Sequence, residues 1–345
     1  MQYTTLGKTG LTVSVAGLGC GGNSRVGLGT GLTTAQSVAL VREAIDLGVT
    51  FIDTAEAYDT EHIVGEAIAG IDRGSVVIST KCRITEGSAP RSGAQAVASL
   101  ENSLRNLRTD YVDVFLLHGV PPQAYDRVRG ELAPALLREK EKGKIRHLGM
   151  SETSPLDPEH AMLQRALADP VWEVVMFAFH MLNQAARTKV FSQTQAKGVG
   201  TLLMFVVRNI FSRPGLLAET MNRLAMEGKV PKEFASKTNP LDFLVHEGGA
   251  ASVVDAAYRF ARHEPGSEVV LFGTGNREHL RSNIESILRP PLPRADVEKL
   301  YASFGALRGV GLDLPDRACR RDSVSDVVAA RIRSMLGRIL STSRT

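Results

Sequence analysis

The chain has 345 residues, of which 43% are hydrophobic and 23% are charged. These fractions are typical of a globular protein with a large core, and the length allows one large domain or two ordinary ones. The formal net charge is only +4, so we expect no nucleic-acid partner. Cys20, Cys82 and Cys319 are too far apart to indicate a disulfide framework or a zinc site, and we expect no bound metal.

The first residues lack the basic and apolar regions of a secretory signal. No apolar stretch approaches the about 20 residues that a membrane span needs. We therefore expect a cytoplasmic protein without a membrane partner.

The chain begins with a predicted β-hairpin and continues as alternating strands and helices. Residues 1–15 contain two short apolar runs around Gly7-Lys8-Thr9-Gly10, which indicates the hairpin. The predicted strands cover 16–19, 49–53, 75–80, 111–117, 145–150, 173–177, 199–205 and 268–272. The predicted helices cover 34–45, with Thr34 as the N-cap, and then 61–69, 93–107, 130–142, 158–168, 184–197, 250–263 and 276–288. Eight strand–helix units favour an α/β fold, a (β/α)8 TIM barrel over about 16–290.

An open doubly wound sheet is the alternative fold. It requires a glycine-rich turn between a strand and a helix, and residues 17–22 resemble that fingerprint only superficially, because no helix follows before Thr34. We therefore favour the barrel and treat residues 1–345 as a single domain.

Two regions interrupt the alternation. Residues 206–249 form a long connection rich in proline and glycine, which is typical of a functional loop or lid. The tail, about 291–345, is predicted as a helical extension with a helix near 295–307. Its basic segment 327–340 is predicted to pack as an amphipathic helix on the barrel in preference to a membrane surface.

Polar, titratable residues follow three consecutive predicted strands. Asp53, Lys81 and His118 each lie at a strand end, and Tyr58 lies in the loop after Asp53. Individually, an aspartate there is commonly a helix cap and a histidine a structural residue. Together, at the carboxyl ends of barrel strands, the four indicate a catalytic site.

The four residue types suit proton transfer beside a hydride donor. Tyr58 is the candidate acid, and one ammonium at about 4 Å contributes about 4 kcal/mol toward tyrosinate at an effective dielectric of 20. We therefore expect Lys81 to lower the pKa of Tyr58, Asp53 to keep Lys81 charged, and His118 to orient a carbonyl. The set offers no nucleophile activated by a base, which disfavours hydrolase chemistry.

The chain resembles the aldo-keto reductase family from Leu6 to Asn283. The motifs are Phe51-Ile52-Asp53-Thr54-Ala55 with Tyr58, Ser79-Thr80-Lys81, Asp110-Tyr111-Val112-Asp113 through Leu117-His118, and Gly143-Lys144-Ile145-Arg146 through Gly149-Met150-Ser151. The resemblance implies a barrel with the hairpin over its bottom. It also implies a catalytic tetrad of Asp53, Tyr58, Lys81 and His118, and a nicotinamide cofactor, usually NADPH, with NADH possible.

The resemblance also implies a set of cofactor contacts. A small-residue turn before a helix suits a phosphate, and Arg277 would favour a 2′-phosphate. The residues are Gly19, Cys20, Gly21, Ser151, Glu152, Met176, Met204, Phe205, Gly273, Thr274, Gly275, Asn276, Arg277, His279 and Asn283.

The nicotinamide pocket departs from the family pattern. Glu152 stands where Asn is usual, Met176 where Gln is usual, and Met204-Phe205 where an aromatic ring is usual. A carboxylate accepts but cannot donate a hydrogen bond, so we hypothesise that Glu152 favours binding of the oxidised cofactor. The alternative is that Glu152 points to solvent.

Three functions remain open from the sequence. The leading one is NADPH-dependent reduction of a small aldehyde or ketone. The others are NAD(P)-dependent dehydrogenation of a sugar or small hydroxy compound, and a weakly active cofactor-binding regulatory subunit. The substrate, the direction and the oligomeric state stay undetermined because the variable βα loops and the tail set them.

Overall fold

A closed barrel of eight parallel strands forms the centre of the computed structural model, which describes residues 1–313. Met1–Leu312 form one compact unit. The strands are paired in the order β10-β11-β12-β3-β4-β5-β8-β9. They are β3 (Ala16–Gly19), β4 (Phe51–Asp53), β5 (Val77–Arg83), β8 (Val112–Val120), β9 (Ile145–Glu152), β10 (Val174–Ala178), β11 (Gly200–Met204) and β12 (Val269–Phe272). The predicted (β/α)8 barrel is confirmed.

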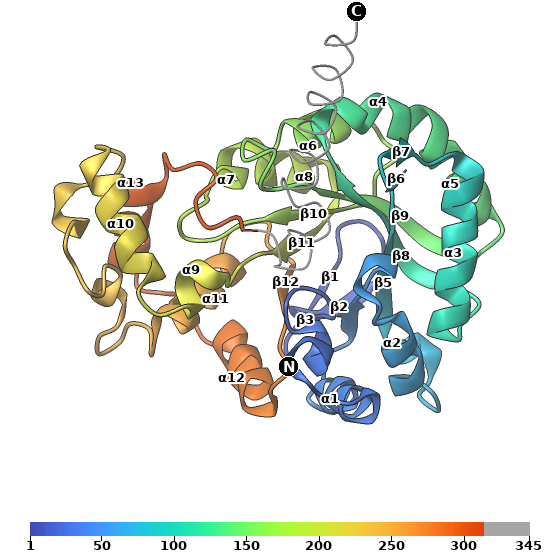
Figure 1. The fold of residues 1–345 in the computed structure, drawn as a ribbon, viewed down its shortest axis with the longest axis horizontal. Helices are drawn as coiled ribbons and strands as arrows, with labels where there is room; N and C mark the ends of the chain where they lie inside the picture. Colours follow the sequence, from blue (N-terminus) through green and yellow to red (C-terminus); the bar gives the residue numbers. More distant parts are fainter. Residues whose placement is uncertain (314–345) are drawn as a thin grey trace, which may run out of the picture. The chain divides into compact units, whose positions relative to one another are not determined.

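The helices lie outside the ring of strands, with α3 and α5 side by side near β5 and β9 and with α10 and α13 at the left of the view, away from the strands (Figure 1). They are α1 (Thr34–Asp46), α2 (Glu61–Ala67), α3 (Gly93–Leu107), α4 (Tyr125–Arg127), α5 (Ala133–Glu141), α6 (Ala161–Ala166), α7 (Ala186–Lys189), α8 (Phe191–Lys197), α9 (Asn209–Ser212), α10 (Leu216–Met226), α11 (Val253–Arg262), α12 (Arg277–Leu288) and α13 (Arg294–Phe304). The N-cap of α1 is Thr33, not the predicted Thr34, because Thr33 and Gln36 form a capping box. Within residues 1–313, no helix is long and apolar enough to cross a membrane.

Alternation along the strands separates two cores. In β8, Phe115 and Leu117 pack with the core between strands and helices, whereas Val114 and Leu116 pack inside the barrel. Successive side chains of a strand point to opposite faces, so both faces of each strand are buried. This double burial explains why the strands read as continuous apolar runs in the sequence.

The predicted hairpin consists of β1 (Tyr3–Thr5) and β2 (Thr12–Ser14), paired antiparallel. Its residues Leu6, Leu11 and Val13 join the core inside the barrel. Burial of such a side chain contributes roughly 1.5–3 kcal/mol. The hairpin is also hydrogen-bonded to the amino end of the barrel, where Ser14 Oγ accepts from Thr50 N, just before β4, at 2.9 Å. It therefore closes the end opposite the predicted site.

The long connection 206–249 is more ordered than its proline and glycine content predicts. It contains α9, α10 and two short 3₁₀ turns, Lys232–Phe234 and Asp242–Leu244. Met221 and Leu224 of α10 are buried in the outer core, which explains why a helix forms here. The helix predicted near 295–307 is α13. The predicted basic helix 327–340 lies outside the described residues.

Candidate active site

The strands place three of the predicted catalytic residues on the inner face of the barrel. Asp53 ends β4, two residues after the interior Phe51, and its register partner on β5 is Ser79. Lys81 lies two residues beyond Ser79. Both β5 and β8 run further than predicted, so Lys81 and His118 lie within strands and not just past their ends. The period of two directs Asp53, Ser79 and Lys81 to the same side.

Lys81 and Asp53 form a buried ion pair. Lys81 Nζ donates to Asp53 Oδ2 at 2.6 Å and to the Thr54 carbonyl at 2.8 Å. Ser79 Oγ donates to the other carboxylate oxygen of Asp53 at 3.0 Å. The side chains of Lys81 and Asp53 are 0% and 5% exposed. Burial alone disfavours the ammonium, but Asp53 and Tyr58 outweigh it and raise the pKa of Lys81. Burial also raises the pKa of Asp53, and Lys81 and Ser79 oppose that rise. The Lys81 ammonium therefore stays charged at neutral pH, with Asp53 as its acceptor.

Tyr58 extends over this pair from a short 3₁₀ turn, Glu56–Tyr58. The Lys81 ammonium lies 4.7 Å from the centroid of the Tyr58 ring. The Tyr58 hydroxyl lies 3.4 Å from Nε2 of His118, and the two rings meet edge to face at 90°. The structure thus brings Asp53, Tyr58, Lys81 and His118 into one cluster.

The pKa of Tyr58 differs from the prediction. Burial raises it, and the Lys81 ammonium opposes the rise without reversing it. Lys81 lowers the pKa of Tyr58 as predicted, but the expected net lowering was wrong, because the prediction omitted the desolvation of the phenolate and the opposing charge of Asp53. Burial, Lys81 and Arg83 together lower the pKa of His118 to about 3. At neutral pH, Tyr58 is therefore a protonated phenol and His118 a neutral imidazole.

The ends of β8 and β9 are joined beside His118. Ser151 Oγ accepts from Gly119 N at 2.9 Å, and Thr153 Oγ1 donates to Gly119 O at 2.6 Å. Gly119 has φ +62°, a left-handed conformation that suits glycine. These contacts fix the backbone that follows His118. A hydroxyl that accepts one hydrogen bond can still donate another, so Ser151 keeps the capacity for a cofactor contact.

Glu152 is not exposed to solvent, so the solvent-facing alternative is wrong. Its residue exposure is 3%, and its carboxylate accepts from three protein donors. These are Ser154 Oγ at 2.8 Å, Ala178 N at 2.9 Å and His160 Nδ1 at 2.6 Å. The side chain of His160 is also fully buried. Glu152 therefore ties β9 to β10 and to the start of α6.

The other residues of the predicted nicotinamide pocket are mainly apolar. Met176 is 2% exposed and packs in the interior core, where its register partner on β9 is Ser151. Met204 is half-buried against that core. Phe205 has φ +63°, and the Arg208 guanidinium lies 4.4 Å from its ring centroid. Gly19, Cys20 and Gly21 form the end of β3 and the residues after it, and Cys20 N donates to Asp53 O at 2.7 Å.

The predicted phosphate turn precedes α12. Asn276 is the N-cap, and its Oδ1 accepts from the N–H groups of Glu278 and His279. A phosphate at this helix end would compete with Asn276 for these groups. Arg277 pairs with Glu43 of α1 at 3.1 Å, and Arg281 pairs with the same carboxylate at 2.7 Å. Gly273, Thr274, Gly275 and Asn283 complete the predicted set around this turn.

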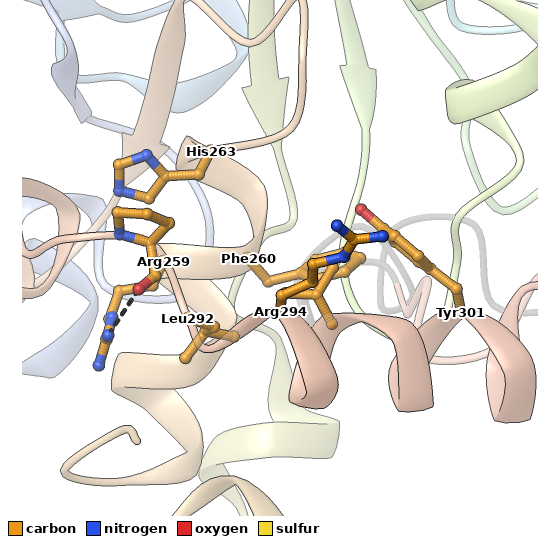
Figure 2. Close-up of a pocket in the computed structure, with 8 residues that line it drawn as sticks. Arg259, Phe260, His263, Leu292, Arg294 and Tyr301 are labelled. Carbon is orange, nitrogen blue, oxygen red and sulfur yellow. Dashed lines mark hydrogen bonds between the residues drawn. The ribbon is translucent and has the colours of Figure 1, made fainter. Parts of the chain in front are cut away.

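A pocket of about 200 Å³ lies elsewhere, among α11, the segment before α13, and α13 itself (Figure 2). Arg259, Phe260, His263, Leu292, Arg294 and Tyr301 are among its lining residues. Arg259 donates to the carbonyls of Pro290 and Pro291, and His263 contacts the Arg289 carbonyl. None of the predicted site residues lines this pocket.

Arg281, Arg25 and His160 are among the residues at the site that were not predicted from the sequence. Arg281 lies one helical turn after Arg277, so an i, i+4 search along α12 would have found it. Arg25 donates to the carbonyl of Tyr58, and His160 contacts Glu152. Both contacts join segments that no local pattern connects. Among residues 1–313, no group of three or more His, Cys, Asp or Glu side chains is arranged to hold a metal ion.

Comparisons with known proteins agree with this geometry. The pattern of the Aldo/keto reductase family matches residues 17–303. L-galactose dehydrogenase from Arabidopsis thaliana is 29% identical over 208 residues, which cover 59% of this chain and 64% of that protein. Aldo-keto reductase YhdN from Bacillus subtilis (strain 168) is 28% identical over 289 residues, which cover 79% of this chain and 85% of that protein.

Solved structures share the architecture. The thermostable aldo-keto reductase Tm1743, solved in complex with the inhibitor epalrestat, is 25% identical. It superposes with a TM-score of 0.65, covering 88% of this chain and 99% of that one. The family match extends over most of the barrel, including all four clustered residues. The chain therefore belongs to the aldo-keto reductase family, whose members are NAD(P)H-dependent oxidoreductases.

Proposed function

We propose that this chain reduces the carbonyl group of a small aldehyde or ketone, with NADPH as cofactor and Tyr58 as the general acid. One observation carries the proposal: the Tyr58 hydroxyl lies 3.4 Å from His118 Nε2 while its ring lies over the Lys81 ammonium. A carbonyl oxygen near both hydroxyl and imidazole would meet a proton donor and an orienting group.

The protonation states favour the reductive direction. Burial raises the pKa of Tyr58, so its hydroxyl carries a proton at neutral pH and can donate it to the carbonyl oxygen. The phenolate that forms lies beside Lys81, whose charge Asp53 maintains at 2.6 Å. His118 is neutral, because its pKa is lowered to about 3. Its imidazole would therefore hydrogen-bond to the substrate carbonyl as an uncharged group.

The residues around α12 fit a phosphorylated nicotinamide cofactor, which when bound would supply the hydride. Arg277 and Arg281 are 62% and 66% exposed and share the single carboxylate of Glu43. Two guanidinium groups on one carboxylate leave a net positive charge, which suits the 2′-phosphate of NADPH. Ser151 would contact the nicotinamide end, because it lies on the inner face beside Met176.

The second candidate is the reverse reaction, oxidation of a sugar or another small hydroxy compound. The similarity to an L-galactose dehydrogenase supports it. In that direction Tyr58 must first lose its proton, which the raised pKa opposes at neutral pH. A weakly active cofactor-binding subunit is the third candidate, and the complete catalytic cluster argues against it.

The test is a cofactor titration followed by activity screens in both directions. NADPH oxidation is measured with aldehydes and ketones, and NADP⁺ reduction with alcohols and sugars. Tyr58→Phe is expected to lower turnover by roughly 10²–10⁴-fold while cofactor fluorescence titration gives an unchanged Kd. Arg281→Ala is expected to weaken NADPH binding more than NADH binding. No wild-type turnover in either screen would refute the enzymatic proposal and support the regulatory alternative.

A further inference from the structure

We propose that Arg25 is a positioning residue that, together with Gly21, holds Tyr58 in its productive orientation. The proposal rests on the proposed function, since it concerns the group assigned there as general acid. Both residues belong to the segment after β3, and neither lies next to Tyr58 in the sequence.

The Arg25 guanidinium binds the backbone of the turn that carries Tyr58. Its Nε donates to the Tyr58 carbonyl at 2.6 Å, and its Nη2 donates to the Asp59 carbonyl at 3.3 Å and to Asp59 Oδ2 at 2.9 Å. The Arg25 side chain is only 12% exposed. Three hydrogen bonds from one partly buried guanidinium therefore fix the end of the Glu56–Tyr58 turn.

The backbone at Arg25 has a strained, left-handed conformation that residues other than glycine rarely adopt. Arg25 and Val26 have φ values of +45° and +48°, in the left-handed region. Such residues persist only where surrounding contacts stabilise them, and they concentrate at functional sites. Gly27 N and Gly29 N both donate to the Ser24 carbonyl, which closes this segment into a compact turn. The turn presents the guanidinium toward Tyr58.

Gly21 packs directly against the ring of Tyr58. A Cβ added at Gly21 would lie 2.6–2.8 Å from three atoms of the Tyr58 ring. Real contacts of that length do not occur, so the ring would have to move. The segment after β3 thus fixes Tyr58 by two kinds of contact: Arg25 hydrogen-bonds to its carbonyl, and Gly21 packs closely against its ring.

Small displacements matter at this position. The Tyr58 hydroxyl is already 3.4 Å from His118 Nε2, and the ring is centred 4.7 Å from the Lys81 ammonium. A misplacement of about 1 Å costs on the order of 100-fold in rate where a reacting group must be aligned. A longer distance to Lys81 also weakens the electrostatic attraction by which the ammonium stabilises the Tyr58 phenolate.

The test compares Arg25→Met with Arg42→Met. Arg42 is a matched control because it donates to two backbone carbonyls, those of Ala67 and Glu66, away from Tyr58. With NADPH and 4-nitrobenzaldehyde as the probe substrate, Arg25→Met is expected to lower kcat by about 10- to 100-fold. The Kd for NADPH should stay unchanged. Arg25→Lys should restore part of the rate, and Arg42→Met should keep the wild-type kcat.

The pH profile separates positioning from general loss of stability. The titratable groups around Tyr58 are Lys81, Asp53, Cys20 and His118. Lys81 and Asp53 supply the charges, because burial raises the pKa of the Cys20 thiol and lowers that of His118, so both stay neutral at neutral pH. If Tyr58 moves away from Lys81, the alkaline decline of kcat should shift to higher pH in Arg25→Met but not in Arg42→Met. Gly21→Ala should lower kcat in the same way, whereas Gly130→Ala, with open space at its Cβ, should not.

The outcomes distinguish this proposal from the one on which it rests. If Tyr58→Phe keeps full turnover, the proposed function itself fails. If Tyr58→Phe is inactive while Arg25→Met and Gly21→Ala keep the wild-type kcat and pH profile, only the positioning role is refuted. Should Arg25→Met fail to fold, Gly21→Ala and Arg25→Lys carry the same test.

Discussion

Lys81→Met should destabilise the fold far more than the loss of one ordinary surface lysine. Methionine has a similar length and fills the same space, but it removes the only cation bonded to Asp53 in the buried cluster described above. The Asp53 carboxylate then stays buried, with Ser79 as its remaining side-chain donor. Breaking one half of a buried pair in this way costs about 3–5 kcal/mol in unfolding free energy.

The geometry sets the size of the coupling between the two residues. At 2.6 Å and an effective dielectric of 20, the attraction between the charges is about 6 kcal/mol. Desolvation costs several kcal/mol for each ion and offsets most of it. Removing both charges, in Asp53→Asn/Lys81→Met, should therefore cost much less than the sum of the single changes, with a coupling of roughly 3 kcal/mol or more.

Urea unfolding of the four proteins measures this cycle. Trp172 is 2% exposed and is the single tryptophan, so its fluorescence reports the transition. Arg294→Met is the matched control, because the Arg294–Glu298 pair is largely exposed, and it should leave the midpoint unchanged. Additive effects of the two single changes would refute the account of Lys81 and Asp53 as a mutually dependent ion pair.

Two further predictions concern His118 of this cluster and the buried Glu152. The pKa of His118 is lowered to about 3, below the ordinary 6.5, so its contribution to stability is present above pH 6.5 and is lost as the pH falls toward 3. NMR should show two imidazoles that stay neutral to about pH 4, those of the buried His118 and His180, and one of these two signals should disappear in His118→Gln. A midpoint near 6.5 for the signal that disappears would contradict this. Glu152→Gln should lower the unfolding free energy by about 1–3 kcal/mol, because three buried donors lose their charged acceptor. Because these three donors occupy the Glu152 carboxylate, the affinity ratio for oxidised and reduced cofactor should stay unchanged. A changed ratio would instead support the hypothesis that Glu152 acts on the nicotinamide.

The fold was predictable because its signals are local. Apolar runs of strand length alternate with segments of helical period, and eight repetitions allow few architectures other than a closed barrel. The errors fall where tertiary packing outweighs composition. Residues 216–226 form a helix despite the surrounding prolines and glycines, because Met221 and Leu224 are buried in the outer core.

The members of the candidate catalytic cluster were predictable for a similar reason. A parallel barrel places the carboxyl ends of all its strands at one end, so strand order alone brings Asp53, Lys81 and His118 together. Period-two alternation then decides which side chains face inward.

The electrostatic state and the supporting contacts of these residues required the tertiary structure. The raised pKa of Tyr58 depends on how deeply the phenol is buried and on how closely Asp53 balances Lys81, and no sequence pattern encodes either distance. Arg25 hydrogen-bonds to Tyr58, which is 33 residues away in the sequence, and Glu152 hydrogen-bonds to Ala178, which is 26 residues away. The sequence by itself determined the barrel and the chemical groups at its carboxyl end, because both follow from local periodicity. Only the folded chain decided how those groups are charged and held, because these properties arise from contacts between distant segments.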